Sequence, residues 1–396
     1  MVSNMGLISL IRAILPLSRS TGRDFEHLKE FFDKKELREI KKILKQKSIG
    51  IAYTSLGISP WLITDLKFPQ MHLAVEDKGI GKNIKKWNDI VTDRIKRRQI
   101  LEFGKIAEQR LPACIATNIE GMDMIKHAAA LQLVSTERIH ILLLGDPGTG
   151  KTDIIRTASE LHDNSTYGLG SGTSGVGLTV SVKGKNISPG LLPLADRGIC
   201  ALDELNLIKQ KDLGSLYNAM EKGFVTYNKS DKKLTFDAKV RIIATANPKG
   251  DRFVGKGMQI LKQQIPFDPA LLTRFHLVFF IRTPNIDQFV AITKKIVENK
   301  NAKLSDKDIE FIKEFVDYAE DINVEFPKDL KTKVVEFAKS LKENEEKYFV
   351  DISPRIVHGI IRIAQANARM SLRRKVLLHD LEIAQKIMRT SLEVAK

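Results

Sequence analysis

The chain has 396 residues, 43% of them hydrophobic and 28% charged, which is typical of a globular protein with two or three domains and a sizeable core. Its formal net charge of +16 favours a polyanionic partner, nucleic acid first, although a lysine-rich surface that binds nothing in particular gives the same balance. Its two cysteines, Cys114 and Cys200, exclude a disulfide scaffold and a structural zinc site, and no apolar stretch is long enough to span a membrane.

Residues 1–110 carry the fewest signals, and we expect a small, mostly helical N-terminal domain of unassigned role. The first residues, MVSNMGLISLIRAILPL, lack a basic leader, which favours an amphipathic helix over a signal peptide, with an interfacial membrane helix as the alternative. Apolar spacing predicts a helix over Phe25–Lys47, whereas Gly and Pro break Ile49–Met71 into turns and short elements. The basic stretch Lys78–Arg110 predicts either a helical linker that touches phosphates or a solvated face.

Residues 111–283 alternate strand and helix patterns, which is typical of an α/β domain with a parallel sheet. The predicted strands are apolar or β-branched throughout, as strands covered on both faces should be. They are Ile139–Leu144, Ile199–Leu202, Val240–Thr245 and Leu277–Ile281.

The first predicted strand runs into a phosphate-binding loop that fits the pattern G-x-x-x-x-G-K-[ST] at every position. The loop comprises Gly145, Asp146, Pro147, Gly148, Thr149, Gly150, Lys151 and Thr152. Its glycines let backbone N–H groups point at phosphate oxygens, and the helix expected over Lys151–Leu161 adds its positive end. Lys151 would supply a charge to the β- and γ-phosphates of ATP, and the Thr152 hydroxyl a ligand for Mg²⁺. The alternative is a glycine turn that matches by chance.

Two carboxylates follow the second predicted strand. Asp203 and Glu204 come directly after Ile199–Leu202, at the edge where open parallel sheets bind ligands. We expect Asp203 to hold Mg²⁺, directly or through water, and Glu204 to polarise the attacking water as general base. Because an apolar run followed by Asp-Glu is common, this prediction depends on the phosphate loop upstream.

Three more polar residues complete the candidate catalytic set with Lys151, Asp203 and Glu204. Asn247 follows a strand and precedes Pro248, so its amide either positions the lytic water or merely starts a turn. Arg274 stands just before the last predicted strand, where it can reach a neighbouring subunit's nucleotide as an arginine finger. Arg355 opens a C-terminal helix, on the side that can fold back over the nucleotide.

Residues 284–396 show helical periodicity almost without strand signals, which predicts an all-helical domain attached to the α/β domain. Ser353-Pro354 predicts one helix start, with Ser at the N-cap and Pro at the first helical position. The expected helices are Ile286–Glu298, Asp306–Tyr318, Pro327–Leu341, Pro354–Leu372 and Asp380–Val394. Within the α/β domain, Phe224–Phe236 alternates apolar and polar residues around a polar tip, which predicts a β-hairpin.

Six ordered blocks in residues 111–396 resemble the AAA+ ATPases and, within them, the minichromosome maintenance (MCM) family of replicative helicases. The blocks are GDPGTGK at Gly145–Lys151, LADRGICALDEL at Leu194–Leu205, AMEKGFVTYNK at Ala219–Lys229, ATANP at Ala244–Pro248, LLTRFHLVF at Leu271–Phe279 and ARMSL at Ala368–Leu372. The resemblance implies an α/β P-loop NTPase fold with a parallel sheet, inserted β-hairpins and a C-terminal all-helical lid.

The resemblance also implies an activity and partners. The protein would form a ring, expected to be a hexamer, and couple hydrolysis of ATP with Mg²⁺ to DNA translocation or unwinding. Its implied partners are single- or double-stranded DNA, other copies of itself, and a full-length MCM or another replication protein, with no membrane. We expect a cytoplasmic, nucleoid-associated location.

The family's DNA-contacting hairpins align with two segments. Lys229 takes the place of the DNA-contacting lysine at the first hairpin tip, and Lys232 and Lys233 add charge there. Gly175–Ser188 resembles the family's second inserted hairpin in abbreviated form. Near its tip are Lys183 and Lys185. For both segments the alternative is a solvent-exposed loop.

Several residues depart from the family pattern. Gly150 and Thr152 replace the usual Ala and Ser, His276 replaces an Asp, and Lys222 replaces a Gln that reaches the adjacent subunit's nucleotide. Residues 1–110 have no counterpart of the family's oligonucleotide-binding barrel or zinc ribbon, and no winged helix follows Lys396, so we expect a reduced MCM-like protein.

Two other functions stay open. A protein-remodelling AAA+ ATPase of the chelatase/MoxR type shares the inserted hairpins, and aromatic Tyr227 near the tip favours it. A regulatory or loading partner of a full-length MCM would be non-motor. Basic hairpin tips favour the DNA motor, because protein threaders usually need aromatic pore residues.

Overall fold

A computed structural model describes residues 34, 49–53, 71–75, 81–183, 186–229, 232–255, 257–284, 286–298 and 304–393. The chain divides into two compact units, residues 1–103 and 104–396. The amphipathic helix expected in the first seventeen residues, and the helix Phe25–Lys47 apart from helical Lys34, lie outside the described residues. No described helix is both long and apolar enough to cross a membrane.

The first unit contains a pair of short strands. β1 (Ile49–Tyr53) and β2 (Met71–Val75) pair antiparallel, with Ile49 opposite Val75. The basic stretch that follows forms one long helix, α5 (Gly81–Ala113), whose last ten residues belong to the second unit.

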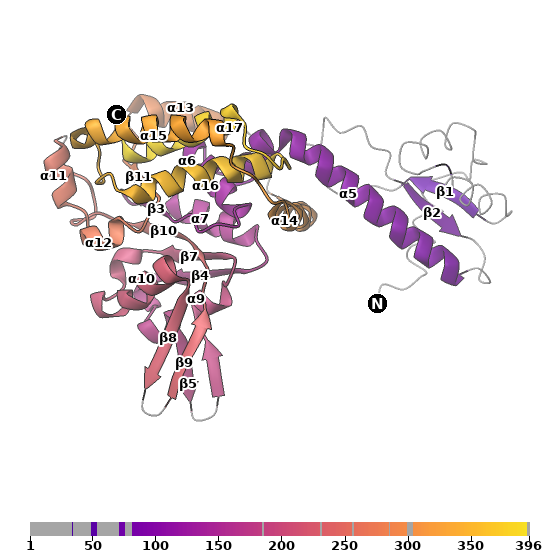
Figure 1. The fold of residues 1–396 in the computed structure, drawn as a ribbon, viewed down its shortest axis with the longest axis horizontal. Helices are drawn as coiled ribbons and strands as arrows, with labels where there is room; N and C mark the ends of the chain where they lie inside the picture. Colours follow the sequence, from indigo (N-terminus) through magenta and orange to yellow (C-terminus); the bar gives the residue numbers. More distant parts are fainter. Residues whose placement is uncertain are drawn as a thin grey trace. The chain divides into compact units, whose positions relative to one another are not determined.

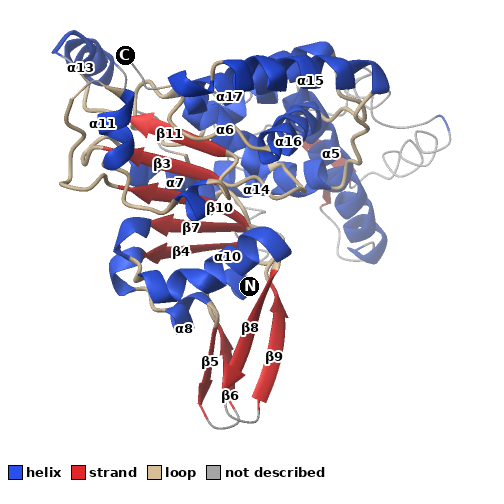
Figure 2. Cartoon of the chain, turned by 60° about the vertical axis from the view of Figure 1, so that its left-hand side comes forward, coloured by secondary structure: helices blue, strands red, loops and turns tan. Residues whose placement is uncertain are grey.

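The second unit is built on a five-stranded parallel sheet, in the order β11-β3-β10-β7-β4. The strands are β3 (Ile141–Gly145), β4 (Ser165–Leu169), β7 (Ile199–Asp203), β10 (Arg241–Ala246) and β11 (Leu277–Ile281). All residues of β3, β7, β10 and β11 are buried, as predicted from their apolar sequences. Figure 2 shows the five arrows pointing the same way, so their carboxyl ends meet at one edge.

Helices and short turns connect the strands. α7 packs on β4, β7 and β10, and α6 contacts α7. The longer helices of this part are α6 (Asp123–Leu133), α7 (Lys151–Glu160) and α10 (Leu213–Lys222). The shorter ones are η1 (Gly170–Gly172), α8 (Gly175–Leu178), α9 (Leu191–Leu194), η2 (Leu205–Leu207), η3 (Gln210–Asp212), α11 (Met258–Gln263) and α12 (Pro269–Leu272).

Two hairpins extend side by side from the β4 side of the sheet (Figures 1 and 2). One joins β5 (Val180–Lys183) to β6 (Asn186–Pro189), and the other joins β8 (Phe224–Lys229) to β9 (Lys232–Asp237). The hairpin predicted over Phe224–Phe236 is confirmed. Of the candidate lysines, Lys185 lies outside the described residues, and only the backbone is described for Lys183, Lys229, Lys232 and Lys233.

The helical C-terminal region is confirmed. It comprises α13 (Ile286–Glu298), α14 (Asp306–Glu320), α15 (Lys328–Glu343), η4 (Glu345–Lys347), α16 (Pro354–Met370) and α17 (Leu378–Leu392). Ser353 precedes α16 as predicted, with Pro354 in its first turn, but the Ser353 side chain makes no capping hydrogen bond. α17 packs against α16 and β11, which joins this region to the sheet (Figure 1).

A buried arginine also joins the helical region to the sheet. Arg241, at the start of β10, is 2% exposed and pairs with Glu320 at the end of α14. Its guanidinium nitrogen Nη2 lies 2.6 Å from His162 Nε2, and its Nε donates to Gly198 O. Glu320 is half-buried, and separating it from Arg241 would leave the buried guanidinium group uncompensated. This contact therefore holds the end of α14 against the sheet.

Candidate functional site

The phosphate loop begins at the carboxyl end of β3 and turns directly into α7. Gly148 and Gly150 have φ angles of +73° and +83°, a conformation that glycine adopts without steric cost. A Cβ on Gly150 would also lie 2.9 Å from Ile119 Cδ1, so the alanine that the family resemblance leads us to expect there would be strained in this backbone. The loop therefore has the curled backbone that the pattern predicts.

The Lys151 ammonium lies inside this loop. Its Nζ donates to Gly145 O at 2.9 Å and Asp146 O at 2.6 Å, and it lies 3.4 Å from Thr149 Oγ1. The residue is 6% exposed. Burial lowers the pKa of Lys151 to about 8, although the nearby carboxylates of Asp146 and Asp203 oppose the shift. The loop thus holds a cation that is mostly protonated at neutral pH.

The Asp203 carboxylate ends β7 beside this loop and accepts four hydrogen bonds. Thr152 Oγ1 donates at 3.3 Å and Glu204 N at 3.1 Å, the Thr245 hydroxyl donates to the same oxygen, and Tyr167 donates to the other at 2.9 Å. Burial, together with the bond to Asp203, raises the pKa of Tyr167 to about 12. The structure therefore brings together Thr152 and Asp203, the predicted Mg²⁺ ligands, and their hydroxyl and carboxylate oxygens are of the type that Mg²⁺ prefers.

Glu204 and Asn247 follow neighbouring strands at the same edge. Glu204 has a φ of +53°, and its N–H also donates to Thr245 Oγ1 at 2.9 Å. A Cβ on Gly170 would lie 2.1 Å from Glu204 O, so only glycine fits against this turn. Asn247 N donates to Asn206 Oδ1 at 3.1 Å. In the described part of the chain, neither the Glu204 carboxylate nor the Asn247 amide group has a side-chain hydrogen bond, and both residues are partly accessible.

The side chain of Asp146 connects the phosphate loop to two other segments. Its carboxylate accepts from Phe253 N at 2.9 Å, Thr283 N at 2.9 Å and Thr283 Oγ1 at 3.0 Å. Burial alone would raise the pKa of Asp146, but these three bonds outweigh it and lower the pKa below its ordinary value. Asp146 was predicted as a cofactor-binding residue, but its carboxylate is engaged with the chain itself, and its backbone N–H donates to Ile281 O at 3.0 Å.

The two candidate arginines lie at the opposite edge of the sheet. Arg274 precedes β11 by three residues, and the register pairs Leu277 with Ile141 and Ile281 with Gly145. Five strand residues at about 3.3 Å each separate the two edges by roughly 16 Å. Within one chain Arg274 is therefore too far from the phosphate loop to contact a phosphate held there.

Both arginines contact one carboxylate at this edge. Arg274 Nη2 lies 3.0 Å from Glu221 Oε2, and Arg355 Nη2 lies 3.3 Å from Glu221 Oε1. Arg355 Nη1 also donates to Thr273 O at 3.1 Å. The Arg274 guanidinium carbon lies 4.7 Å from the centre of the Tyr217 ring. Glu221 lies within the block AMEKGFVTYNK, but no role was predicted for it, and Tyr217 lies outside all six blocks.

His276, which stands where the family pattern has Asp, is a buried structural residue. Its Nδ1 accepts from His140 N at 3.1 Å, and its ring lies 5.3 Å from that of His140. Burial, then the charges of His140 and of arginines that include Arg362, lower the pKa of His276 well below its usual value. The imidazole is therefore neutral and supplies no charge to a phosphate.

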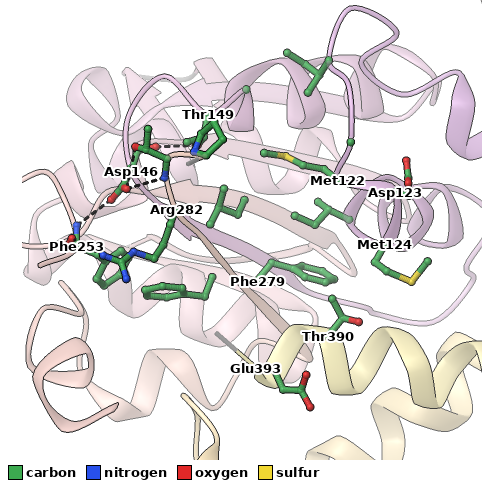
Figure 3. Close-up of a pocket in the computed structure, with 18 of the residues that line it drawn as sticks. Met122, Asp123, Met124, Asp146, Thr149, Phe253, Phe279, Arg282, Thr390 and Glu393 are labelled. Carbon is green, nitrogen blue, oxygen red and sulfur yellow. Dashed lines mark hydrogen bonds between the residues drawn. The ribbon is translucent and has the colours of Figure 1, made fainter. Parts of the chain in front are cut away.

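A cavity of about 1920 Å³ opens beside the loop. Figure 3 shows Asp146 and Thr149 at one side of it, with Met122, Phe279 and Thr390 contributed by three other segments. Its walls come from the loop, the connection before α6, the end of β11 with the residues that follow, α13, and the lid helix α17. None of Asp203, Glu204 and Asn247 lines it. The strand edge that carries these three residues lies on one side of the loop, and the cavity lies on the other. This arrangement suits a nucleotide whose phosphates lie at the strand edge and whose base and ribose lie in the cavity.

The sequence missed these walls because no local pattern marks them. Met122 adopts a left-handed φ of +59° before α6, and Lys386 and Arg389 on α17 bring basic side chains to the cavity. These residues are far from the phosphate loop in the sequence, and only the tertiary fold brings them to the same cavity.

The comparisons with known proteins agree with this geometry. The MCM P-loop domain model matches residues 96–300, and the MCM AAA-lid domain model matches residues 310–392. The minichromosome maintenance protein MCM of Saccharolobus solfataricus is 28% identical over 307 residues, covering 72% of this chain and 44% of that protein. The DNA replication licensing factors mcm7 of Schizosaccharomyces pombe and MCM4 of Arabidopsis thaliana are each 29% identical, over 74% and 77% of this chain and 42% and 40% of theirs.

The chain thus spans less than half the length of these curated relatives. Because the P-loop model alone matches over half of the chain, and the lid model matches most of the remainder of its second unit, the chain belongs to the MCM family of AAA+ ATPases.

Proposed function

We propose that the protein is a ring-forming ATPase that binds DNA and couples ATP hydrolysis to DNA translocation or unwinding. The observation that carries the proposal is the separation of the candidate residues. Lys151, Asp203 and Glu204 lie at the carboxyl edge of the sheet, and Arg274 and Arg355 at the amino edge. A complete site therefore requires two copies of the chain, arranged so that the amino edge of one faces the carboxyl edge of the next.

Such a contact is heterologous, because different surfaces of each copy meet. Repeated heterologous contacts produce either a closed ring or an open filament. We propose a closed ring, and a hexamer as its size. On this basis residues 111–283 serve as the nucleotide-binding domain, 284–396 as the lid and 1–110 as a separate N-terminal domain.

In the proposed hydrolysis, each residue has one task. Lys151 and the backbone N–H groups of the loop bind the β- and γ-phosphates. Thr152 and Asp203 would hold Mg²⁺, which when bound neutralises phosphate charge. Glu204 accepts the proton of the attacking water, and the Asn247 amide orients that water.

Two structural contacts support these tasks. Tyr167 holds Asp203 Oδ2, and the Gly170 backbone packs against the Glu204 carbonyl. The neighbour's Arg274 and Arg355 would stabilise the charge that develops on the γ-phosphate, as an arginine finger does.

The hairpins are the proposed DNA contacts. Lys229, Lys232, Lys233 and Lys183 stand at the strand ends nearest the two turns, and Lys185 follows β5 in the sequence. Lysines that neutralise phosphates bind DNA without sequence preference and release counterions. The formal charge of +16 and the family membership support DNA over an acidic protein as the polyanion, and a full-length MCM or another replication protein as a further partner.

The direct test compares ATP hydrolysis with and without single-stranded DNA, on protein whose assembly state has been measured. Lys229→Ala should lower DNA affinity about equally across sequences and reduce the salt slope by about 0.7–0.9 for each lost contact. Hydrolysis without DNA should survive, since the tip is remote from the loop. The matched control is Lys331→Ala, an exposed lysine of α15, which should change neither quantity.

Two outcomes would contradict the proposal. If assembled wild-type protein hydrolyses ATP with no response to DNA, or if Lys229→Ala behaves like Lys331→Ala, the DNA motor fails. Stimulation by an unfolded polypeptide instead of DNA would favour the protein-remodelling ATPase.

A further inference from the structure

Glu221 joins three functional parts of the second unit. It lies in the last turn of α10, and its two carboxylate oxygens each contact one of the candidate trans-acting arginines, Arg274 and Arg355. Arg274 comes from the segment before β11 and Arg355 from the first turn of lid helix α16. One carboxylate therefore connects α10, the arginine-finger segment and the lid.

The charges of this cluster do not balance. Two guanidinium groups face a single carboxylate, which leaves one net positive charge at a partly exposed site: the side chains of Arg274, Glu221 and Arg355 are 19%, 45% and 38% exposed. In addition, Arg274 Nε is buried and has no hydrogen-bond partner among the described residues. A buried donor without a partner is unfavourable, so the arginine pair retains capacity for a further anion.

A nucleotide phosphate is the anion that fits this capacity. Guanidinium groups bind phosphate oxygens in the same bidentate way that they bind carboxylates. A γ-phosphate on a neighbouring subunit would therefore compete with Glu221 for the same two side chains.

The same helix leads directly into a hairpin. α10 ends at Lys222 and is capped by Gly223, which adopts a φ of +78°, and β8 begins at the residue after Gly223. Gly223 O accepts from Ala238 N at 2.9 Å, just after β9 ends. Both stems of the β8–β9 hairpin are thus held at the end of α10, two residues from Glu221. A displacement of α10 must move the base of this hairpin.

From these contacts we infer that Glu221 is a positioning residue that couples the neighbour's nucleotide to the β8–β9 hairpin. Without that nucleotide, Glu221 holds Arg274 and Arg355 and fixes α10. When the neighbour's phosphates take over the two arginines, Glu221 is released, and α10 and the hairpin stems change position. The inference rests on the proposed function, because it requires that the two arginines act on a neighbouring subunit.

The test places a reporter on the β8–β9 hairpin of a subunit that cannot bind nucleotide itself. Thr235→Cys, at an exposed position of β9, supplies a single labelling site, because Cys114 and Cys200 are both fully buried. The labelled protein also carries Lys151→Ala and is mixed with excess unlabelled wild-type protein. Any change in fluorophore anisotropy or quenching on adding ATP must then come from a nucleotide held by another subunit.

With Glu221 intact, ATP should change the signal. Glu221→Gln keeps the size of the side chain and removes its charge. Added to the labelled chain, it should abolish the ATP response and place the signal near its ATP-bound value even before ATP is added. Glu221→Asp, which keeps the charge, should restore part of the response. Glu336→Gln, an exposed glutamate of α15, is the control and should respond fully.

A kinetic measurement on unlabelled protein accompanies the reporter. Since a partly exposed ion pair is worth about twofold to fivefold in an equilibrium constant, Glu221→Gln should lower the KM for ATP by about that factor and reduce the stimulation of kcat by DNA. If Glu221→Gln alters the thermal unfolding or the assembly state, that variant is misfolded. The ATP response of Glu221→Asp then decides whether the carboxylate is required for the coupling.

The failures are distinguishable. If the labelled chain with intact Glu221 gives no ATP response, although the wild-type ring hydrolyses ATP, the shared site of the proposed function fails. If that chain responds and Glu221→Gln responds equally, the shared site stands and the coupling role of Glu221 is overturned.

Discussion

Replacing Asp146 with alanine tests whether this carboxylate holds the phosphate loop in place. The residue is 4% exposed, and its carboxylate accepts three hydrogen bonds, from Phe253 N, Thr283 N and Thr283 Oγ1 at 2.9–3.0 Å. Asp146→Ala removes the acceptor and leaves the two backbone N–H groups without a partner.

The size of the loss follows from these contacts. A hydrogen bond to a charged group contributes about 1.5–3 kcal/mol, and bonds that share one carboxylate do not add fully. We therefore expect Asp146→Ala to lower the free energy of unfolding by about 3–5 kcal/mol, a large part of the roughly 5–15 kcal/mol of a typical domain. Asp146→Asn keeps one acceptor oxygen but turns an amide donor toward Thr283 or Phe253, and should cost about 2 kcal/mol.

The assay is urea unfolding at pH 7, with Asp329→Ala, an exposed aspartate of α15, as the control. Because the folded-state pKa of Asp146 is lowered, its contribution is fully present above the unfolded pKa of about 4 and is lost as the pH falls through the folded value. The difference between wild type and Asp146→Asn should therefore shrink only in acid. A loss below 1 kcal/mol for Asp146→Ala, or a difference that shrinks between pH 6 and 8, would refute the reasoning.

Two further predictions concern the nucleotide. Glu204→Gln should bind ATP with little change but hydrolyse it at least about a hundredfold more slowly, because the base is lost and the Mg²⁺ ligands remain; hydrolysis at the wild-type rate would show that Glu204 is not the base. Because the pKa of Lys151 is lowered to about 8, its charge is present at pH 7 and mostly lost at pH 9, so ATP affinity measured by fluorescence titration should fall by about tenfold between these values. An affinity that is flat over this range would place the loop's cation elsewhere.

The sequence predicted the buried strands best. β11 was predicted without error, and β3, β7 and β10 within two residues at each end, because continuous apolar runs bounded by glycine and polar residues mark buried parallel strands. β4 was not predicted. Its residues STYGL are mostly half-buried at the edge of the sheet, so neither an apolar run nor alternation identified them.

The helical region was predicted nearly as well. α13 has the predicted bounds, and the other four helices differ from the predicted ones by at most two residues at either end. α14, for example, continues two residues beyond its predicted end, to Glu320, which pairs with the buried Arg241. A periodic apolar face determines that a helix exists, but tertiary contacts determine where it stops.

The candidate site was predictable only where a local motif carries it. The loop and Asp203 follow from strand–glycine and strand–carboxylate patterns, and the structure brings Thr152 and Asp203 together. Tyr167 and Glu221 lie far in sequence from the groups that they contact, and no spacing rule connects them. Asp146 was expected at the phosphates, but its carboxylate binds Phe253 and Thr283 instead. A sequence motif specifies which residues occur, but it does not specify the direction of each side chain.

The central claim is that a neighbouring subunit completes each ATPase site, and mixing two inactive proteins tests it most directly. Arg274→Ala keeps an intact loop and Lys151→Ala keeps an intact finger, so each alone should be inactive. In an equal, subunit-exchanging mixture, one interface in about four combines the intact loop with the intact finger, and ATP hydrolysis should recover toward about a quarter of the wild-type rate. No recovery in a mixture whose subunits demonstrably exchange would contradict a site shared between subunits.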